Sequence, residues 1–317
     1  MSDRHNPTMA TEIADRFALG RAIELTGPHA RGHQGEVWKL RTDLGTWAIK
    51  RSFAQQDEAE LAGPAALQEA AYAAGVATPR VVRSIEGNIF ADVGLGQVRV
   101  DEWVDLMDAD TGIDPAEVGN TVAAVHRLPS GPLDERDPWY HQGVGAARWI
   151  ELIDQLVVAD APFAGDLARQ RSGLVAMESF IEPAVDLQTC HRDLWADNVR
   201  RGADGRIWVI DWNDCGPADP GHELAALLFE YTYDDASRAR AMYQAYLAAG
   251  GPGRVRRPGD FSMAIAQLGH ILEISCRRWL ASTDDRPLNE SRVAEFVTKP
   301  LSRPLIDGIV AAVSAIR

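Results

Sequence analysis

The sequence predicts an α+β protein with a small antiparallel sheet lobe that carries one helix, followed by a larger, mainly helical lobe. A chain of 317 residues is long enough for two such lobes. The N-terminal third is rich in short β-branched and aromatic runs between turn residues. Beyond Asp105, apolar residues recur at helical spacing. We place the N-terminal lobe at residues 1–105, a hinge at about 101–106, and the C-terminal lobe at 106–317.

The N-terminal lobe should contain five strands and one helix. Residues 19–51 alternate in the manner of strands, and two more strands are expected between residues 78 and 105. The Ala- and Glu-rich residues 57–74 favour a helix, which Gly63–Pro64 should break or restart. The expected turns lie at Gly27–Pro28, at Asp43–Gly45 and near Glu86–Asn88.

The C-terminal lobe should be helical except for one polar segment. Short strands are expected around Val199 and over residues 206–211, and residues 251–260 should form a loop. The apolar spacing predicts helical stretches at 114–128, 147–157, 172–185, 221–250, 261–282 and from Pro304 onward.

Composition and charge narrow the class of protein. The net charge of −14, most of it after residue 100, argues against a nucleic-acid partner. This acidic part favours either a cationic ligand or simply solubility. Apolar runs are too short to span a bilayer, and the start lacks a signal-peptide pattern. Three unpaired cysteines fit a reducing cytoplasm, and we expect a cytoplasmic monomer or small homo-oligomer.

The residues "HRDLWADN" match the kinase catalytic-loop pattern H-R-D-x-x-x-x-N. In this pattern Asp193 accepts the proton of the attacking hydroxyl, and Asn198 turns back to coordinate a metal ion. A strand–turn–strand then brings Asp211 beside Asn198, and these oxygen ligands suit Mg²⁺. The alternative is a polar hairpin with an incidental His-Arg-Asp. The complete pattern favours phosphoryl transfer from a nucleotide.

Lys50 ends the strand "WAIKR" and resembles the kinase lysine that contacts nucleotide phosphates. Such a lysine pairs with a glutamate on the next helix. Glu58, Glu60 and Glu69 are candidates, and we favour Glu69. The alternative is an ordinary strand that ends in lysine.

Two further segments are candidates for nucleotide contact. Gly32 and Gly35 lie at useful spacing in "GPHARGHQGEVW" and could cover phosphates, although a plain hairpin explains them almost as well. The backbone from Glu102 to Val104 lies where the chain crosses between lobes. It could hydrogen-bond adenine, or it could be a simple linker.

The chain resembles the aminoglycoside phosphotransferase superfamily of eukaryotic-kinase-like small-molecule kinases. The resemblance covers nearly the whole length through "WAIKR", "AAGVATPRVV", "VAAVHRLP", "CHRDLWADNV" and "VIDWNDCGPADPGHELA". It implies a bilobal protein-kinase-like fold, ATP and Mg²⁺. It also implies that Asp193 is the base, that Asn198 and Asp211 bind metal, and that Lys50 binds phosphate. Most members read His-Gly-Asp where this chain has Arg192, which could anchor the loop or face the substrate.

The acceptor is expected to be a small cationic amino sugar. The stretch "QTCHRDLWADN" is most similar to actinobacterial glucosamine kinases, which implies transfer to the 6-hydroxyl of D-glucosamine. An antibiotic-modifying kinase, another sugar or amine kinase, or an inactive nucleotide-binding module are the alternatives. Tryptophans suit sugar faces and carboxylates suit an ammonium group, although core packing and turn formation are the competing roles. The candidate substrate residues, besides Asp193 and Arg192, are Gln188, Trp195, Asp197, Asn213, Asp214, Glu223 and Trp279.

Overall fold

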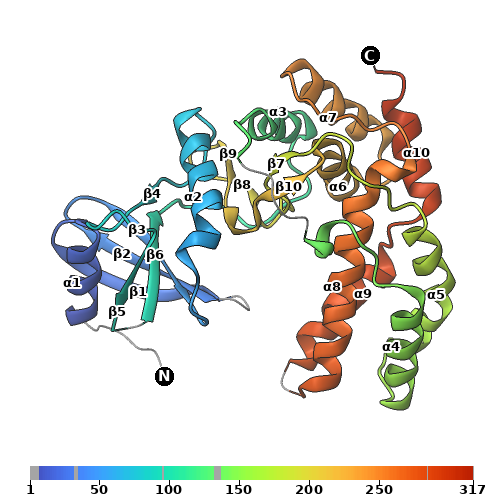
Figure 1. Ribbon diagram of the computed structural model, residues 1–317, viewed down its shortest axis with the longest axis horizontal. Helices are drawn as coiled ribbons and strands as arrows, with labels where there is room; N and C mark the ends of the chain where they lie inside the picture. Colours follow the sequence, from blue (N-terminus) through green and yellow to red (C-terminus); the bar gives the residue numbers. More distant parts are fainter. Residues whose placement is uncertain (1–6, 32–34, 95, 132–136, 284, 317) are drawn as a thin grey trace. The chain divides into compact units, whose positions relative to one another are not determined.

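The computed structural model describes residues 7–31, 35–94, 96–131, 137–283 and 285–316. The chain forms two compact units (Figure 1). The first unit comprises residues 1–110 and 196–215, and the second comprises 111–195 and 216–317. The expected α+β class is therefore confirmed, with an antiparallel sheet in one unit and helices dominating the other. The division differs from a single boundary near residue 105, because residues 196–215 group with the sheet.

An antiparallel sheet forms the body of the first unit, with strand order β1-β2-β3-β6-β4 and β5 also paired to β6. Asp43–Gly45 makes the expected turn between β2 and β3. Gly27–Pro28, by contrast, lies inside β1, where the register with β2 shifts. The strands are β1 (Ala22–Arg31), β2 (Gly35–Thr42), β3 (Thr46–Ser52), β4 (Val81–Val82), β5 (Phe90–Val93) and β6 (Gly96–Glu102).

Two helices pack on this sheet. Helix α1 (Pro7–Arg16), which the sequence pattern did not reveal, buries Ile13 in the sheet core. Helix α2 (Glu58–Ala73) begins at the Asp57 cap and runs through Pro64 without a break, contrary to expectation. The proline removes one backbone donor, but burial of Leu61 and the residues beside it against β5 offsets that loss.

A short hairpin, β8 (Val199–Arg201) and β9 (Ile207–Val209), belongs to the first unit. It is attached to the segment after β6 by backbone hydrogen bonds. The Met107 amide donates to the Arg201 carbonyl at 2.8 Å, and the Ala203 amide donates to the Asp105 carbonyl at 2.8 Å. These bonds explain why residues 196–215 join the sheet unit. The chain then enters the 3₁₀ turn η2 (Trp212–Asp214).

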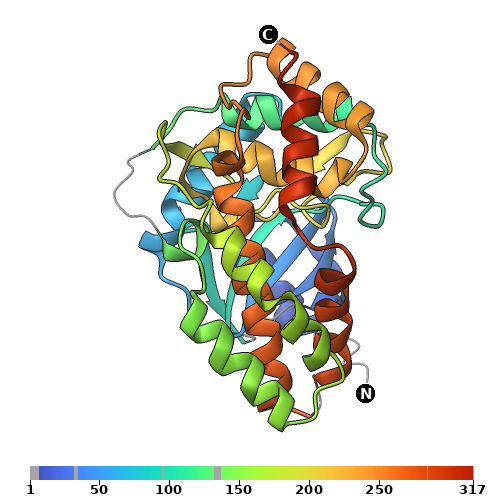
Figure 2. The ribbon, with the colours of Figure 1, turned by 90° about the vertical axis from the view of Figure 1, so that its right-hand side faces the viewer.

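The second unit is helical, apart from the antiparallel pair β7 (Gln188–Cys190) and β10 (Gly216–Ala218). The helical stretch expected at 221–250 divides at Tyr233, whose φ of 44° is not helical. Figure 2 shows α4 and α5 alongside α8 and α9, which share one hydrophobic core. The helices are α3 (Pro115–His126), α4 (Ala146–Val158), α5 (Ala164–Glu178), α6 (Pro220–Thr232), α7 (Ala236–Ala248), α8 (Ser262–Ala281), α9 (Arg286–Thr298) and α10 (Arg303–Val313), with 3₁₀ turns η1 (Pro138–Tyr140) and η3 (Pro258–Phe261).

Among the helices that the structure describes, none combines the length and the apolar character needed to cross a bilayer.

Candidate active site

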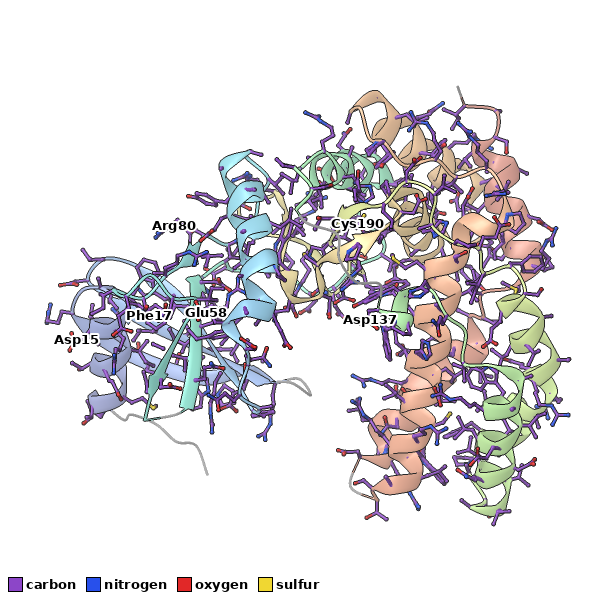
Figure 3. The ribbon with its side chains drawn as sticks, viewed as in Figure 1. Asp15, Phe17, Glu58, Arg80, Asp137 and Cys190 are labelled. Atoms are coloured by element: carbon purple, nitrogen blue, oxygen red, sulfur yellow. The ribbon has the colours of Figure 1, made fainter. Side chains whose placement is uncertain are left out.

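The candidate catalytic loop follows β7 in the second unit, directly after Cys190, which Figure 3 labels. Arg192 adopts a φ of 65°, a left-handed conformation that costs energy for a non-glycine residue. Its backbone is held on both sides. The amide donates to Oε1 of Glu223, and the carbonyl accepts from Nε2 of Gln267 at 2.7 Å. The half-buried Asp193 follows this fixed residue.

The Arg192 side chain points into the helical unit. Its guanidinium carbon lies 3.9 Å from the ring centre of Tyr140. The side chain is mostly buried, and these contacts are those expected of an anchor of the loop. Gln188 is likewise engaged, because its Nε2 donates to the carbonyl of His126 at 2.9 Å.

A series of buried polar contacts runs from Gly253 to Glu223, which binds the Arg192 amide of the loop. The Gly253 amide donates to the hydroxyl of Tyr246 at 2.7 Å, and that hydroxyl lies 2.8 Å from Nδ1 of His126. Nε2 of His126 lies 2.8 Å from Oε2 of Glu223. Burial would raise the pKa of the Glu223 carboxyl, but His126 and the Arg192 amide hold that pKa below its usual value.

Glu223, which we expected to contact substrate, is instead bound to neighbouring residues of the protein. It is 1 % exposed, and both of its oxygens already have partners. Trp279 is also a core residue, because its ring packs against Phe163 with centroids 5.6 Å apart. Its indole donates to Glu290 at 2.8 Å. Both side chains are therefore engaged with other residues of the helical unit.

The two expected metal ligands lie at one end of the β8–β9 hairpin. The strands pair Val199 with Val209, and the next backbone bond runs from the Ile210 amide to the Asn198 carbonyl at 2.9 Å. Asp211 follows immediately, exposed and with a φ of 60°. The hairpin thus puts the backbone of Asn198 opposite Ile210, one residue before Asp211. An amide oxygen and a carboxylate are donors of the kind that Mg²⁺ prefers.

The turn after Asp211 is fixed by two side chains within the first unit. The buried indole of Trp212 donates to Oγ1 of Thr78 at 2.8 Å. Oδ1 of Asn213 accepts from Nη1 of Arg99 at 3.1 Å. Asn213, which we expected to contact substrate, is therefore bound to the sheet through this oxygen. The half-buried Asp214 follows it.

Lys50 does not pair with a glutamate of helix α2. Its Nζ lies 3.1 Å from Oδ2 of Asp101, a buried residue of the neighbouring strand β6. The expected partner Glu69 instead accepts two hydrogen bonds from Arg83, at 2.7 and 3.0 Å. Glu58, labelled in Figure 3, caps the Ile89 amide at 2.6 Å.

Asp101 carries its charge in a buried position. Burial would raise the pKa of its carboxyl, but Arg99 and Lys50 hold that pKa below its usual value. The Lys50 ammonium lies 3.1 Å from Oδ2 of this carboxylate, so the two residues form an ion pair.

The residues that we expected to cover the phosphates or to contact adenine lie in different kinds of position. Gly32 lies outside the described residues. Gly35 begins β2, where a Cβ atom would clash with the Arg51 carbonyl, so close strand packing alone requires a glycine there. The Glu102 amide already donates to the Arg80 carbonyl at 2.8 Å. Val104 is half-buried in the segment that follows β6.

Aromatic side chains flank the catalytic loop within the helical unit. Trp195 and Trp139 are both half-buried against the cluster that includes Met263 of α8. Trp139 also stacks on His270, with ring centres 5.1 Å apart and planes 17° from parallel. Asp197 is exposed. A small hollow behind the loop is lined by Trp195, Gln267 and six neighbours.

Five residues with these contacts had no site role predicted from the sequence, namely Arg99, Asp101, His126, Gln267 and Trp139. Arg99 and Asp101 alternate with buried Val98 and Val100 in β6, and two charges in such a strand were an available signal. His126, Gln267 and Trp139 had no comparable signal, because their partners lie far away in the sequence.

Residues 27–258 match the model of the phosphotransferase enzyme family. No curated protein matches the chain. Among solved structures, the chain is similar to spectinomycin phosphotransferase APH(9)-Ia in complex with ADP and spectinomycin. The TM-score is 0.70 and the identity 13 %, over 96 % of this chain and 98 % of that one.

Two other solved structures have similar folds. An aminoglycoside phosphotransferase from Alicyclobacillus acidocaldarius matches with a TM-score of 0.60 and 18 % identity, over 92 % of each chain. Choline kinase LicA from Streptococcus pneumoniae matches with a TM-score of 0.55 and 15 % identity, over 96 % of this chain and 99 % of that one. At these identities the structures show a common fold.

Proposed function

Because the chain belongs to the phosphotransferase enzyme family, we propose that it is an ATP- and Mg²⁺-dependent kinase that phosphorylates a hydroxyl of a small amino sugar. The favoured reaction converts D-glucosamine to glucosamine 6-phosphate. The observation that carries the kinase proposal is the end of the β8–β9 hairpin. There the backbone bond from Ile210 to Asn198 sets Asn198 opposite the residue that precedes Asp211, directly after the Asp193 loop in sequence, which supports a shared metal-binding role for the two side chains.

Each residue has a defined task in this proposal. Asp193 orients the acceptor hydroxyl and takes its proton as the oxygen attacks the γ-phosphorus. Lys50 binds nucleotide phosphate. Asn198 and Asp211 would hold Mg²⁺, which when bound neutralises phosphate charge. The fixed backbone of Arg192 keeps Asp193 in place before substrate arrives.

An amino-bearing acceptor is supported by the chemistry around the loop and by the family. Trp195 and Trp139 offer aromatic faces, which attract both sugar C–H surfaces and ammonium groups. Aminoglycosides and choline, the acceptors named for the similar structures, share a hydroxyl with a cationic nitrogen. An aminoglycoside antibiotic is therefore the second candidate acceptor.

The test is a coupled assay of ADP release with MgATP and a panel of acceptors. D-glucosamine should give the highest kcat/KM, ahead of glucose and N-acetylglucosamine, which lack the ammonium group. Higher kcat/KM for an aminoglycoside would favour the antibiotic kinase. Equal turnover of glucose and glucosamine would refute recognition of the amine.

The role of Asp193 is tested in the same assay. Asp193→Asn should lower kcat by about 10²–10⁴-fold, as expected for loss of a general base. Asp154→Asn, an exposed change on α4, is the matched control and should leave kcat unchanged. Full activity of Asp193→Asn would contradict the assignment.

A further inference from the structure

The alignment of Lys50 is built into the sheet of this protein. Lys50 lies on β3 and pairs in register with Arg99 of β6, and Asp101 follows two residues later on β6. The Lys50 ammonium faces Oδ2 of Asp101 at 3.1 Å, and Nε of Arg99 lies 3.3 Å from Oδ1 of the same carboxylate. One carboxylate that is 1 % exposed thus serves two cations on adjacent strands.

Arg99 extends this arrangement in two directions. Its Nη2 donates to Oε1 of Gln68 on helix α2 at 2.5 Å. Its Nη1 donates to Oδ1 of Asn213 at 3.1 Å, two residues after Asp211. The guanidinium is almost fully buried, so its planar fork holds three partners in fixed directions.

We propose that Asp101 and Arg99 are positioning residues of the phosphotransferase site. Asp101 aligns Lys50 toward nucleotide phosphate, and Arg99 ties that alignment to the turn that carries Asp211. This inference rests on the proposed role of Lys50 as a phosphate ligand.

If Asp101 is the partner of Lys50, the ion pair does not depend on the position of helix α2. In protein kinases the glutamate partner of the lysine comes from a helix, so movement of that helix controls the ion pair. Here α2 contributes the neutral Gln68, which reaches the pair only through Arg99. Adjacent hydrogen-bonded strands hold both members of the pair, so displacement of α2 leaves Lys50 aligned.

Calorimetric titration with MgADP tests the role of Asp101 without any acceptor. Asp101→Asn should weaken MgADP binding about tenfold or more, because Lys50 and Arg99 lose their shared anion. Gln68→Ala should change the affinity by less than about threefold, because the strand pair persists. Glu69→Gln is the matched control and should bind like the wild type.

Three results would overturn the inference. They are wild-type affinity of Asp101→Asn, a larger loss in Gln68→Ala than in Asp101→Asn, or a comparable loss in Glu69→Gln. If Asp101→Asn does not fold, Asp101→Glu replaces it, since its extra methylene displaces the carboxylate but keeps the charge. Asp101→Glu should also bind MgADP about tenfold more weakly, and unchanged affinity would refute the alignment.

Hydrogen exchange tests whether Arg99 holds the turn that carries Asp211. Arg99→Lys keeps the positive charge but loses the fork, so amide exchange in residues 211–215 should rise at least about tenfold without ligand. Arg83→Lys, at an exposed ion pair, is the control. Unchanged exchange in Arg99→Lys would remove Arg99 from the proposal.

These readouts also separate this inference from the proposed reaction. A wild-type protein that binds MgADP but phosphorylates no amino sugar refutes the acceptor and leaves the alignment standing. A wild-type protein that does not bind MgADP refutes both.

Discussion

Glu223→Gln tests whether the buried polar contacts from Gly253 to Glu223 stabilise the catalytic loop. The substitution keeps the shape of the side chain and removes its charge. Glu223 accepts one hydrogen bond from the Arg192 amide and lies 2.8 Å from Nε2 of His126. A glutamine has one acceptor oxygen and one NH₂ group at the corresponding positions. One of the two interactions therefore becomes a hydrogen bond to an uncharged oxygen, and in the other an N–H group replaces the carboxylate oxygen.

The structure sets the size of the effect. Hydrogen bonds to a charged group contribute about 1.5–3 kcal/mol each, and neutral ones about 1 kcal/mol. Losing one bond and weakening the other costs about 3 kcal/mol, comparable to breaking a buried ion pair. A unit of this size loses about 2–4 °C in Tm per kcal/mol, so Tm should fall by about 6–12 °C.

The pH dependence follows from the direction of the pKa. The pKa of Glu223 is lowered in the folded protein, despite the opposing effect of burial, because His126 and the Arg192 amide favour the carboxylate. Its contribution is therefore complete above the unfolded pKa of about 4.3 and declines as pH falls through the lower folded pKa. The difference in stability between wild type and Glu223→Gln should shrink in that acidic range.

Scanning calorimetry at neutral pH measures the Tm, with the exposed Glu151→Gln on α4 as the matched control. Loosening of Arg192 should also lower kcat about tenfold while the KM for ATP stays unchanged, since the base moves and the nucleotide site does not. A Tm within about 1 °C of the wild type would refute the reasoning.

Two further predictions concern the helical unit and the thiols. Trp279→Ala should lower stability by about 3–5 kcal/mol in denaturant titration, because Trp279 fills the core, and the KM for the acceptor should not change. A tenfold rise in that KM would return Trp279 to the substrate site. All three cysteines are buried, and burial raises the pKa of the Cys276 thiol to about 12. No thiol should therefore react with an aromatic disulfide reagent at pH 8 until denaturant is added, and rapid reaction of the native protein would contradict this burial.

The sequence identified those parts of the site whose geometry is local. The segment from Asp193 to Asp211 contains a loop, a hairpin and a turn within about twenty residues, and hairpin pairing follows from short-range pattern. The expected strands around Val199 and before Asp211 are present as β8 and β9. The expected turn at Asp43–Gly45 is also present, because turn residues act over a few positions.

The sequence was less informative where a long-range contact decides the outcome. Helix α1 forms against the sheet, and most helical stability comes from such tertiary packing rather than from propensity. Helix α2 continues through Pro64 for the same reason. Trp279 and Glu223 appeared suitable for a sugar site, but helix packing buries both of them.

The contrast is clearest at Lys50. The strand "WAIKR" and the later Asp193, Asn198 and Asp211 were sufficient to predict a kinase-like protein, because each residue type is required by the chemistry at its place in the chain. The partner of Lys50 could not be predicted in this way. Strand pairing between β3 and β6 brings in a carboxylate about fifty residues away, and only the tertiary structure places that charge beside the lysine instead of on helix α2.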